Sequence, residues 1–377
     1  MKNFAPPRRL QGIQKSVIRQ VFDRALPGSL NLGLGEPDLP TPTLIRDAAV
    51  RVIRDEQNGY TSHAGLPALR EKIVSEYRYL EGDRDRVIVT AGSQEALYLA
   101  LLSIVDEGDE VLLPNPGFVA YPTIVRMAGG RAVFYELPAG KDFSFDIESF
   151  RHALTGKTKA VVCISPSNPT GRVLSESDLA AIADALKNHD AYLISDEIYR
   201  ELYYGVERPA SATSFHDRTI VISGLSKSMS MTGWRLGWIC GEAVVIQSAL
   251  VLHGYVTTCA SAVSQKASLV AWTDEAESAR ASFRQTFKTR RDHLLNLITT
   301  ELGLRAVAPD GAFYTMVDVS RYGSSMDVAE ALLQERVITV PGSAFGTQGE
   351  GFLRVSFCAD LDLLSEGVER MKKAFGR

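Results

Sequence analysis

Short apolar runs alternate with helical patterns through the middle of the chain, and this alternation constrains the fold more than any other feature. The apolar runs lie at residues 86–90, 110–114, 160–164, 192–195 and 219–223. Helical patterns lie between most of them, for example at 94–105 and at 177–187, where Ser175 is the expected N-cap. Strands that are apolar on both faces and alternate with helices favour an α/β fold, with a mostly parallel sheet covered by helices on both sides.

The last hundred residues have a different pattern. A helical stretch from about 275 to 301 carries apolar residues at helical spacing, and strand-like runs near 312–316 and 352–357 precede a terminal helix. This order indicates a smaller α+β lobe. Residues before about 58 contain no central strand pattern, so they are expected to join that lobe or to bridge the two. The predicted division is a large domain at 46–272 and a small domain made of 1–45 and 273–377.

Charge and cysteine usage exclude several classes of protein. The net charge is -4 and no block of lysine or arginine occurs, which argues against a nucleic-acid or anionic-membrane partner. No apolar stretch follows residues 1–9 and no run is long enough to cross a bilayer, so neither a secretory signal nor a membrane span is expected. The four cysteines and six histidines are scattered, which gives little support to a metal site and favours a reducing cytoplasm.

Polar side chains collect where the predicted strands end. Ligands of open α/β sheets bind outside the carboxyl ends of the strands, so residues placed there are expected to share one rim. The residues that follow strands in this way are Gly92, Ser93, Gln94, Asn168, Asp196, Tyr199, Ser226, Lys227 and Arg235. An amide, a carboxylate, a phenol, an amine and a guanidinium are therefore predicted to converge.

This set of groups matches the needs of a pyridine aldehyde cofactor. Such a cofactor requires an amine for a Schiff base, which Lys227 would supply, and a carboxylate beside its ring nitrogen, which Asp196 would supply. Asn168 and Tyr199 are candidate donors to the ring hydroxyl. Asp196 is also compatible with a helix cap, and Asn168 with a turn before proline.

The cofactor's phosphate and the face of its ring would need further partners. A helix that begins at Gly92 and Ser93, together with the guanidinium of Arg235, forms a typical anion site. Phe118 lies at another strand end, where it would stack on the ring. The alternatives are an ordinary helix start at Gly92 and a purely structural core role for Phe118.

Five motifs then carry a resemblance to a known family. They lie, in order, at residues 33–38, 167–171, 195–199, 226–238 and 352–356. The sequence resembles the class I aminotransferases, which are fold-type-I pyridoxal-phosphate enzymes, over nearly its whole length. The resemblance implies an aspartate-aminotransferase-like fold and pyridoxal 5'-phosphate as the cofactor.

The resemblance also implies roles for individual residues. Lys227 would hold the cofactor and move the substrate's Cα proton, and Asp196 would pair with the ring nitrogen. Gly92, Ser93, Gln94, Ser226 and Arg235 would hold the phosphate, with Asn168 and Tyr199 on the ring oxygen. Arg354 would bind the substrate α-carboxylate with help from Asn168 and the backbone at Gly35; a structural ion pair is the alternative for Arg354.

Tyr60 would reach the phosphate of a neighbouring subunit, which implies a homodimer with shared sites. Many relatives carry a hydroxyl residue where Gly224 stands, so one phosphate hydrogen bond would have to come from water or another donor.

The function predicted from the resemblance is transfer of an amino group from an L-amino acid to a 2-oxo acid by a ping-pong mechanism. A β-lyase or a biosynthetic cyclase on the same fold is the alternative. A ligand-binding regulator would need a basic DNA-binding extension, and no basic segment precedes Asn31. A nicotinamide dehydrogenase would need a G-x-G-x-x-G run after the first strand, which is missing. The sequence leaves aspartate, alanine, aromatic and other donors open, with Ile13, Lys15 and Arg19 as candidates near the substrate.

Overall fold

The computed structural model describes residue 7, residues 10–55 and residues 57–376. The expectation that residues 1–9 begin no secretory signal concerns residues that, except for Pro7, lie outside the described ones. Within the described ranges, no helix combines the length and the apolar character that crossing a membrane requires.

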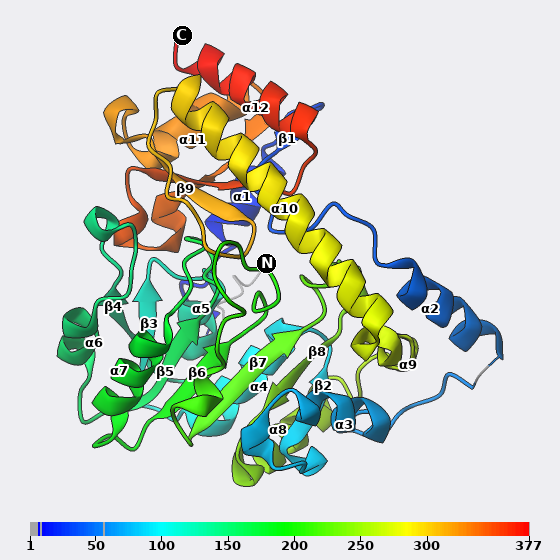
Figure 1. Ribbon diagram of the computed structural model, residues 1–377. Coiled ribbons are helices and arrows are strands. Elements are labelled where there is room, and N and C mark those ends of the chain that lie inside the picture. Colours follow the sequence, from blue (N-terminus) through cyan, green and yellow to red (C-terminus); the bar gives the residue numbers. More distant parts are fainter. Residues whose placement is uncertain (1–6, 8–9, 56, 377) are drawn as a thin grey trace, which may run out of the picture.

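A seven-stranded sheet forms the centre of the larger lobe (Figure 1). Its order is β2-β8-β7-β6-β5-β3-β4, and β8 alone runs antiparallel to both of its neighbours. The strands are β2 (Val87–Thr90), β3 (Glu110–Asn115), β4 (Arg131–Glu136), β5 (Thr158–Ile164), β6 (Tyr192–Asp196), β7 (Thr219–Gly224) and β8 (Gly237–Cys240). The prediction of a mostly parallel sheet is confirmed.

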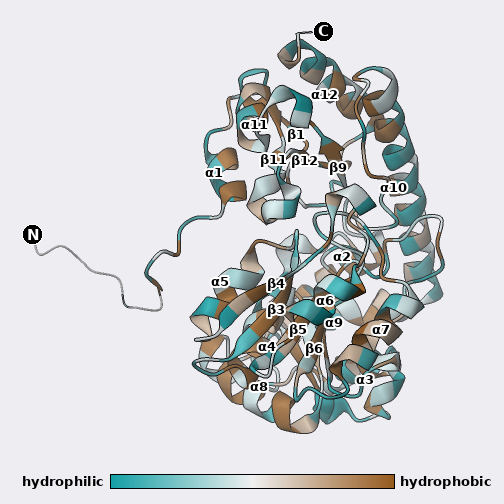
Figure 2. Ribbon diagram, turned by 90° about the vertical axis from the view of Figure 1, so that its left-hand side faces the viewer, coloured by the Kyte–Doolittle hydropathy of each residue, from teal (hydrophilic) through white to brown (hydrophobic). Residues whose placement is uncertain are grey.

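Helices cover both faces of this sheet, as predicted. In β5, Ala160, Val162 and Ile164 pack on one face with α4 (Ser93–Ile104), α5 (Ala120–Met127) and α8 (Ala243–Val256). Val161 and Cys163 of the same strand pack on the other face with α6 (Ile147–Ala153) and α7 (Glu176–Leu186). Nearer β2, that second face carries α2 (Thr43–Asp55), α3 (Pro67–Ser75) and α9 (Ala262–Ser268). Burial on both faces explains the continuous apolar runs, and Figure 2 shows the hydrophobic strands enclosed by more polar helices.

Two helices illustrate how local sequence sets element boundaries. Helix α7 begins after Ser175, whose hydroxyl accepts from the Asp178 N–H while the Asp178 carboxylate accepts from the Ser175 N–H. Helix α10 (Asp274–Thr300) is capped by Thr273 and has 27 residues, so it is about 40 Å long. It runs beside both lobes (Figure 1). The cap at Ser175 is thus confirmed.

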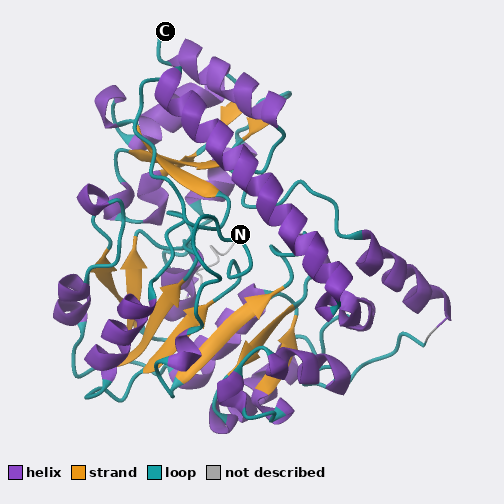
Figure 3. Ribbon diagram, viewed as in Figure 1, coloured by secondary structure: helices purple, strands orange, loops and turns teal. Residues whose placement is uncertain are grey.

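The smaller lobe is built on a three-stranded antiparallel sheet (Figure 3). Its order is β11-β12-β9, with β9 (Tyr314–Asp318), β11 (Val340–Pro341) and β12 (Phe352–Ser356), flanked by α11 (Ser325–Gln334) and α12 (Leu361–Ala374). Strand β9 begins two residues later than the sequence pattern indicated, because Ala312 has a left-handed φ of 57° that interrupts extended backbone.

The N-terminal segment packs on this smaller lobe. Strand β1 (Leu30–Asn31) pairs in parallel with β10 (Val337–Ile338), and Val21 of α1 (Val17–Asp23) packs against Leu333 and Ile338. The chain then passes along residues 33–38, between the lobes, before it enters α2.

Candidate active site

A pocket of about 290 Å³ lies at the carboxyl ends of the central strands. It brings together eleven of the residues predicted from the sequence, namely Gly35, Ser93, Gln94, Phe118, Asn168, Asp196, Tyr199, Ser226, Lys227, Arg235 and Arg354. Gly92 lies directly beside Ser93 at the start of α4, whereas Tyr60 does not line the pocket and is 89% exposed. Ile18, Leu34, Ile164, Ile198, Thr232 and Tyr314 complete the lining.

Lys227 follows the end of β7 and projects into this pocket. Its ammonium donates to the Gly35 carbonyl oxygen at 2.7 Å. Burial lowers the pKa of Lys227 from its ordinary 10.5 to about 8; Cys358 and Glu36 oppose this shift, and the charges of Arg354 and Arg235 add to it. At pH 7 about one amine in ten is then neutral, against about one in three thousand at the ordinary pKa. The amine is therefore prepared to act as a nucleophile and as a proton acceptor.

This pKa predicts how the cofactor-free protein responds to pH. Only the neutral amine attacks an aldehyde, so the rate of pyridoxal phosphate incorporation should rise with pH through a midpoint near 8. Visible absorbance after mixing, measured from pH 6.5 to pH 10.5, gives this profile, and Lys227→Ala corrects for reaction at other lysines. A midpoint above 10 would show that the pocket does not depress this pKa.

Asp196 ends β6 and lies on the floor of the pocket. Tyr121 from α5 donates its hydroxyl to Asp196 Oδ2 at 2.9 Å, and the Ile198 N–H donates to Oδ1 at 3.3 Å. Burial raises the pKa of Asp196 to about 6 despite these donors, so the carboxylate is ionised at neutral pH. Asp196 thus accepts from the backbone N–H of Ile198, as a capping residue does, and also lines the pocket. Tyr121 was not predicted, because nothing in the sequence indicates that an α5 residue reaches the end of β6.

Arg354 is a buried guanidinium with no carboxylate partner among the described residues. It donates to Asn168 Oδ1 at 2.8 Å and to the Gly33 carbonyl oxygen at 2.5 Å, it is 2% exposed, and its Nε has no hydrogen-bond partner. Among the described residues, Arg354 therefore does not form the structural ion pair that was its alternative role. A buried cation that lacks a counter-ion favours an anionic ligand.

Tyr314 joins this group to the phenol of Tyr199. Their two hydroxyls lie 2.9 Å apart, and the Arg354 guanidinium lies 4.3 Å from the centre of the Tyr314 ring. A Cβ on Gly35 would lie 1.8 Å from the Tyr314 hydroxyl, so only glycine allows the backbone to pass here. Tyr314 was missed from the sequence, where it reads as one aromatic residue of an apolar strand.

The start of α4 and Arg235 form an anion site at the opposite end of the pocket. Gly92 is the N-cap of α4 with φ of 91°, and a Cβ there would lie 2.6 Å from the Arg235 guanidinium. Glycine thus permits both the turn and the close approach of the cation. The Ser226 hydroxyl is buried without a hydrogen-bond partner, which leaves it available to a ligand. Helix N–H groups, a guanidinium and a hydroxyl suit a phosphate.

Gly224 has no room for the hydroxyl side chain that many relatives carry. A Cβ there would lie 2.8 Å from the Leu236 carbonyl oxygen and 2.9 Å from Gly237 Cα. The residue lines a different cavity, described below, and not the pocket that holds Lys227.

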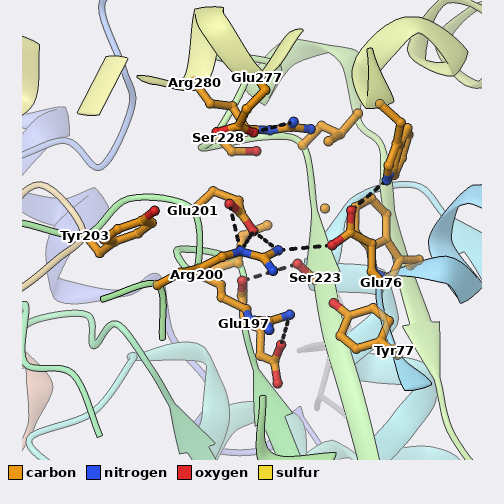
Figure 4. Close-up of a pocket in the computed structure, with 16 residues that line it drawn as sticks. Glu76, Tyr77, Glu197, Arg200, Glu201, Tyr203, Ser223, Ser228, Glu277 and Arg280 are labelled. Atoms are coloured by element: carbon orange, nitrogen blue, oxygen red, sulfur yellow. Dashed lines mark hydrogen bonds and ion pairs between the residues drawn. The ribbon is translucent and has the colours of Figure 1, made fainter. Parts of the chain in front are cut away.

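That second cavity, of about 330 Å³, is lined by residues at the ends of β6 and β7, among them Glu197 and Ser223 (Figure 4). Its charged side chains neutralise one another, since Arg208 binds Glu201 and lies 3.0 Å from Glu76, and Arg200 lies 3.5 Å from Glu197. No lysine lines it. The chemistry of a reactive amine therefore belongs to the pocket around Lys227.

The residues around Lys227 fit pyridoxal phosphate. A largely buried amine with a lowered pKa, a buried carboxylate and an anion site with an unpartnered hydroxyl occupy one pocket. These are the amine, the ring-nitrogen partner and the phosphate donors that the cofactor needs.

Comparisons with known proteins show the family to which the chain belongs. The profile of the family "Aminotransferase class I and II" matches residues 27–371. The chain is 40% identical to the "Putative aminotransferase YugH" of Bacillus subtilis, covering 97% of this chain and 96% of the relative. It is 37% identical to the "Aspartate/prephenate aminotransferase" of Thermus thermophilus, covering 98% of each. The solved Thermus thermophilus aspartate aminotransferase with maleate has a TM-score of 0.91 at 35% identity, covering 99% of this chain and 100% of that one.

The fold and the site thus define a fold-type-I pyridoxal-phosphate enzyme, and the chain belongs to the class I and II aminotransferases. It is an aminotransferase that uses pyridoxal phosphate to move an amino group between an amino acid and a 2-oxo acid.

Proposed function

We propose that Lys227, Asp196 and Arg354 are the residues on which this transamination depends. The observation that carries the proposal is that a largely buried amine, a buried carboxylate and a buried guanidinium without a carboxylate partner among the described residues share one pocket. Bound in it, the cofactor supplies an electron-withdrawing ring that acidifies the substrate Cα–H.

The chain's own residues then divide the work. Lys227 Nζ accepts the Cα proton and returns it at the other end of the transfer. Asp196 would keep a negative charge beside the ring nitrogen, and Asn168 and Tyr199 would donate to the ring oxygen. Arg354 binds the substrate α-carboxylate through two parallel hydrogen bonds.

The remaining predicted residues bind the cofactor's phosphate and ring face. The groups that would hold the phosphate are the N–H groups at Ser93 and Gln94, the Ser226 hydroxyl and the Arg235 guanidinium. Phe118 lines the pocket and meets Tyr121 edge-to-face with ring centres 5.5 Å apart, which supports a place against the ring face.

We also propose a homodimer in which Tyr60 completes the partner's phosphate site. Helix α8 exposes apolar side chains, with Val244 67%, Val251 63% and Tyr255 92% exposed. The Tyr60 segment lies beside this helix, since a Cβ on Gly254 would lie 3.5 Å from His63 Nδ1. Exposed apolar side chains of this kind favour a protein interface. The proposed partner is a second copy of the chain, whose phosphate site Tyr60 would complete.

Hybrid dimers test this arrangement. Lys227→Ala and Tyr60→Ala homodimers should each be impaired. If the sites are shared, their hybrids contain one site with both defects and one intact site. Random exchange of subunits should therefore restore about 25% of wild-type activity. Activity is measured after mixing the two variants, with each variant alone as the control. A mixture no more active than the mean of the separate variants would contradict shared sites.

The domain division at 46–272, with 1–45 and 273–377 as the smaller domain, remains a proposal. It is supported by the seven-stranded sheet within 87–240 and by the pairing of β1 with β10. A reducing cytoplasm is likewise proposed, and the four free cysteines, none of them in a disulfide, are compatible with it.

A further inference from the structure

One part of the active-site pocket is not needed by the cofactor or by the substrate α-carboxylate. Once the phosphate, ring and carboxylate partners are set aside, the lining that remains includes Ile18 from α1, Leu34 and Tyr314. Ile18 and Leu34 belong to the N-terminal segment, and Tyr314 belongs to β9, so this part of the wall comes from the smaller lobe. All three side chains are apolar or aromatic.

Each cationic side chain of the pocket already has a role in the proposed function. The pocket's only cationic side chains among the described residues are Lys227, Arg235 and Arg354, and the proposed function uses each of them. The next cations along the N-terminal segment are Lys15 and Arg19. Both are more than 70% exposed and both pair with Asp23, at 3.0 Å and 3.3 Å.

Ion pairs with Asp23 hold these two cations away from the pocket, which neither of them lines. Lys15 and Arg19 approach Asp23 together, and Arg19 does so at the i, i+4 spacing of one helix face. Ile18 lies on the side of α1 that lines the pocket. The earlier candidates near the substrate, Ile13, Lys15 and Arg19, are thus replaced by Ile18.

We propose that the enzyme prefers amino donors with uncharged, apolar side chains, such as phenylalanine and leucine, and discriminates against aspartate and glutamate. The inference rests on the proposed function, because it assumes that Arg354 is occupied by the α-carboxylate. A second carboxylate would then lose water against Ile18 and Leu34 without a cation from the described residues beside it, which is unfavourable. An apolar side chain would gain contact with the same two residues.

The half-reaction of the holoenzyme measures this preference without an acceptor. The change in the cofactor's visible absorbance is followed with L-phenylalanine, L-leucine, L-alanine, L-aspartate and L-glutamate. We expect the apparent kcat/KM for L-phenylalanine to exceed that for L-aspartate by at least about 100-fold. Equal or faster reaction with L-aspartate would overturn the donor class while leaving transamination intact. Failure with every donor would instead count against the proposed function.

A charge placed at Ile18 should reverse the preference. Ile18→Arg is expected to raise kcat/KM for L-aspartate by at least about 10-fold and to lower it for L-phenylalanine. Gln20→Arg is the matched control, because it adds the same charge to an exposed position of the same helix outside the pocket. If both variants change the ratio of the two donors equally, or if neither changes it, the assignment of Ile18 is wrong. Unchanged cofactor absorbance and circular dichroism establish that each variant is folded.

Discussion

Replacing Lys227 by alanine is expected to lower kcat by at least about 10⁴-fold, which is the upper end of what a positioned proton-transferring group contributes. The substitution removes both the amine that holds the cofactor and the base that accepts the Cα proton. In the structure this amine is largely buried, its pKa is lowered to about 8 and it contacts the Gly35 carbonyl. Among the described residues no other lysine lines the pocket, so none of them is placed to substitute for it.

The measurement is kcat with saturating donor and acceptor, compared with a surface control. Lys187→Ala is suitable, since Lys187 is 71% exposed and pairs only with Asp184 in its own helical turn. It should retain wild-type activity. Full transamination by Lys227→Ala would refute the role of this residue.

Replacing Asp196 by asparagine is expected to lower kcat by about 10³-fold while the protein still folds. The amide oxygen can accept from the Ile198 N–H at the Oδ1 position, and the amide nitrogen at the Oδ2 position can donate to the Tyr121 hydroxyl, so both local contacts can be kept with the Tyr121 bond reversed. What is lost is a buried negative charge beside the ring nitrogen, and preorganised charges of this kind contribute about 10²–10³-fold.

The adjacent carboxylate provides the matched control. Glu197 is also buried, but its Oε1 accepts from both Ser195 and Ser211 and it lines the second cavity. Glu197→Gln should therefore keep kcat near the wild-type value, whatever it does to thermal stability. If Asp196→Asn retained activity within about tenfold of wild type, the electrostatic role of this carboxylate would be contradicted.

The sequence predicted the parts of the fold that depend on local pattern. Strands β5, β6 and β7 are apolar on both faces, so their runs are recognisable without knowledge of their neighbours. The N-cap at Ser175 follows from the side chains of one helical turn. Strands β4 and β8 were not predicted. Strand β4 lies at an edge of the sheet with mixed polarity, and β8 lies in the segment that was read only as a motif around Lys227.

The residues of the site also divide into those that local pattern predicts and those that it does not. Residues that directly follow strands, such as Asp196 and Lys227, could be placed at one rim because parallel strands end together. Tyr121, Tyr314 and Ile18 could not, because each reaches the pocket from an element whose packing against the sheet is a tertiary property. Why glycine stands at position 224, where many relatives carry a hydroxyl residue, reflects the same limit, since the obstruction there comes from the backbone of Leu236 and Gly237.

The central claim is that Lys227 is the amine that carries the cofactor. Reduction of the holoenzyme with borohydride, followed by proteolysis and mass spectrometry, locates the attached phosphopyridoxyl group directly. We predict a single modified peptide with the group on Lys227 at about one per chain. A group found on another lysine, or a reduced protein with none on Lys227, would contradict the account.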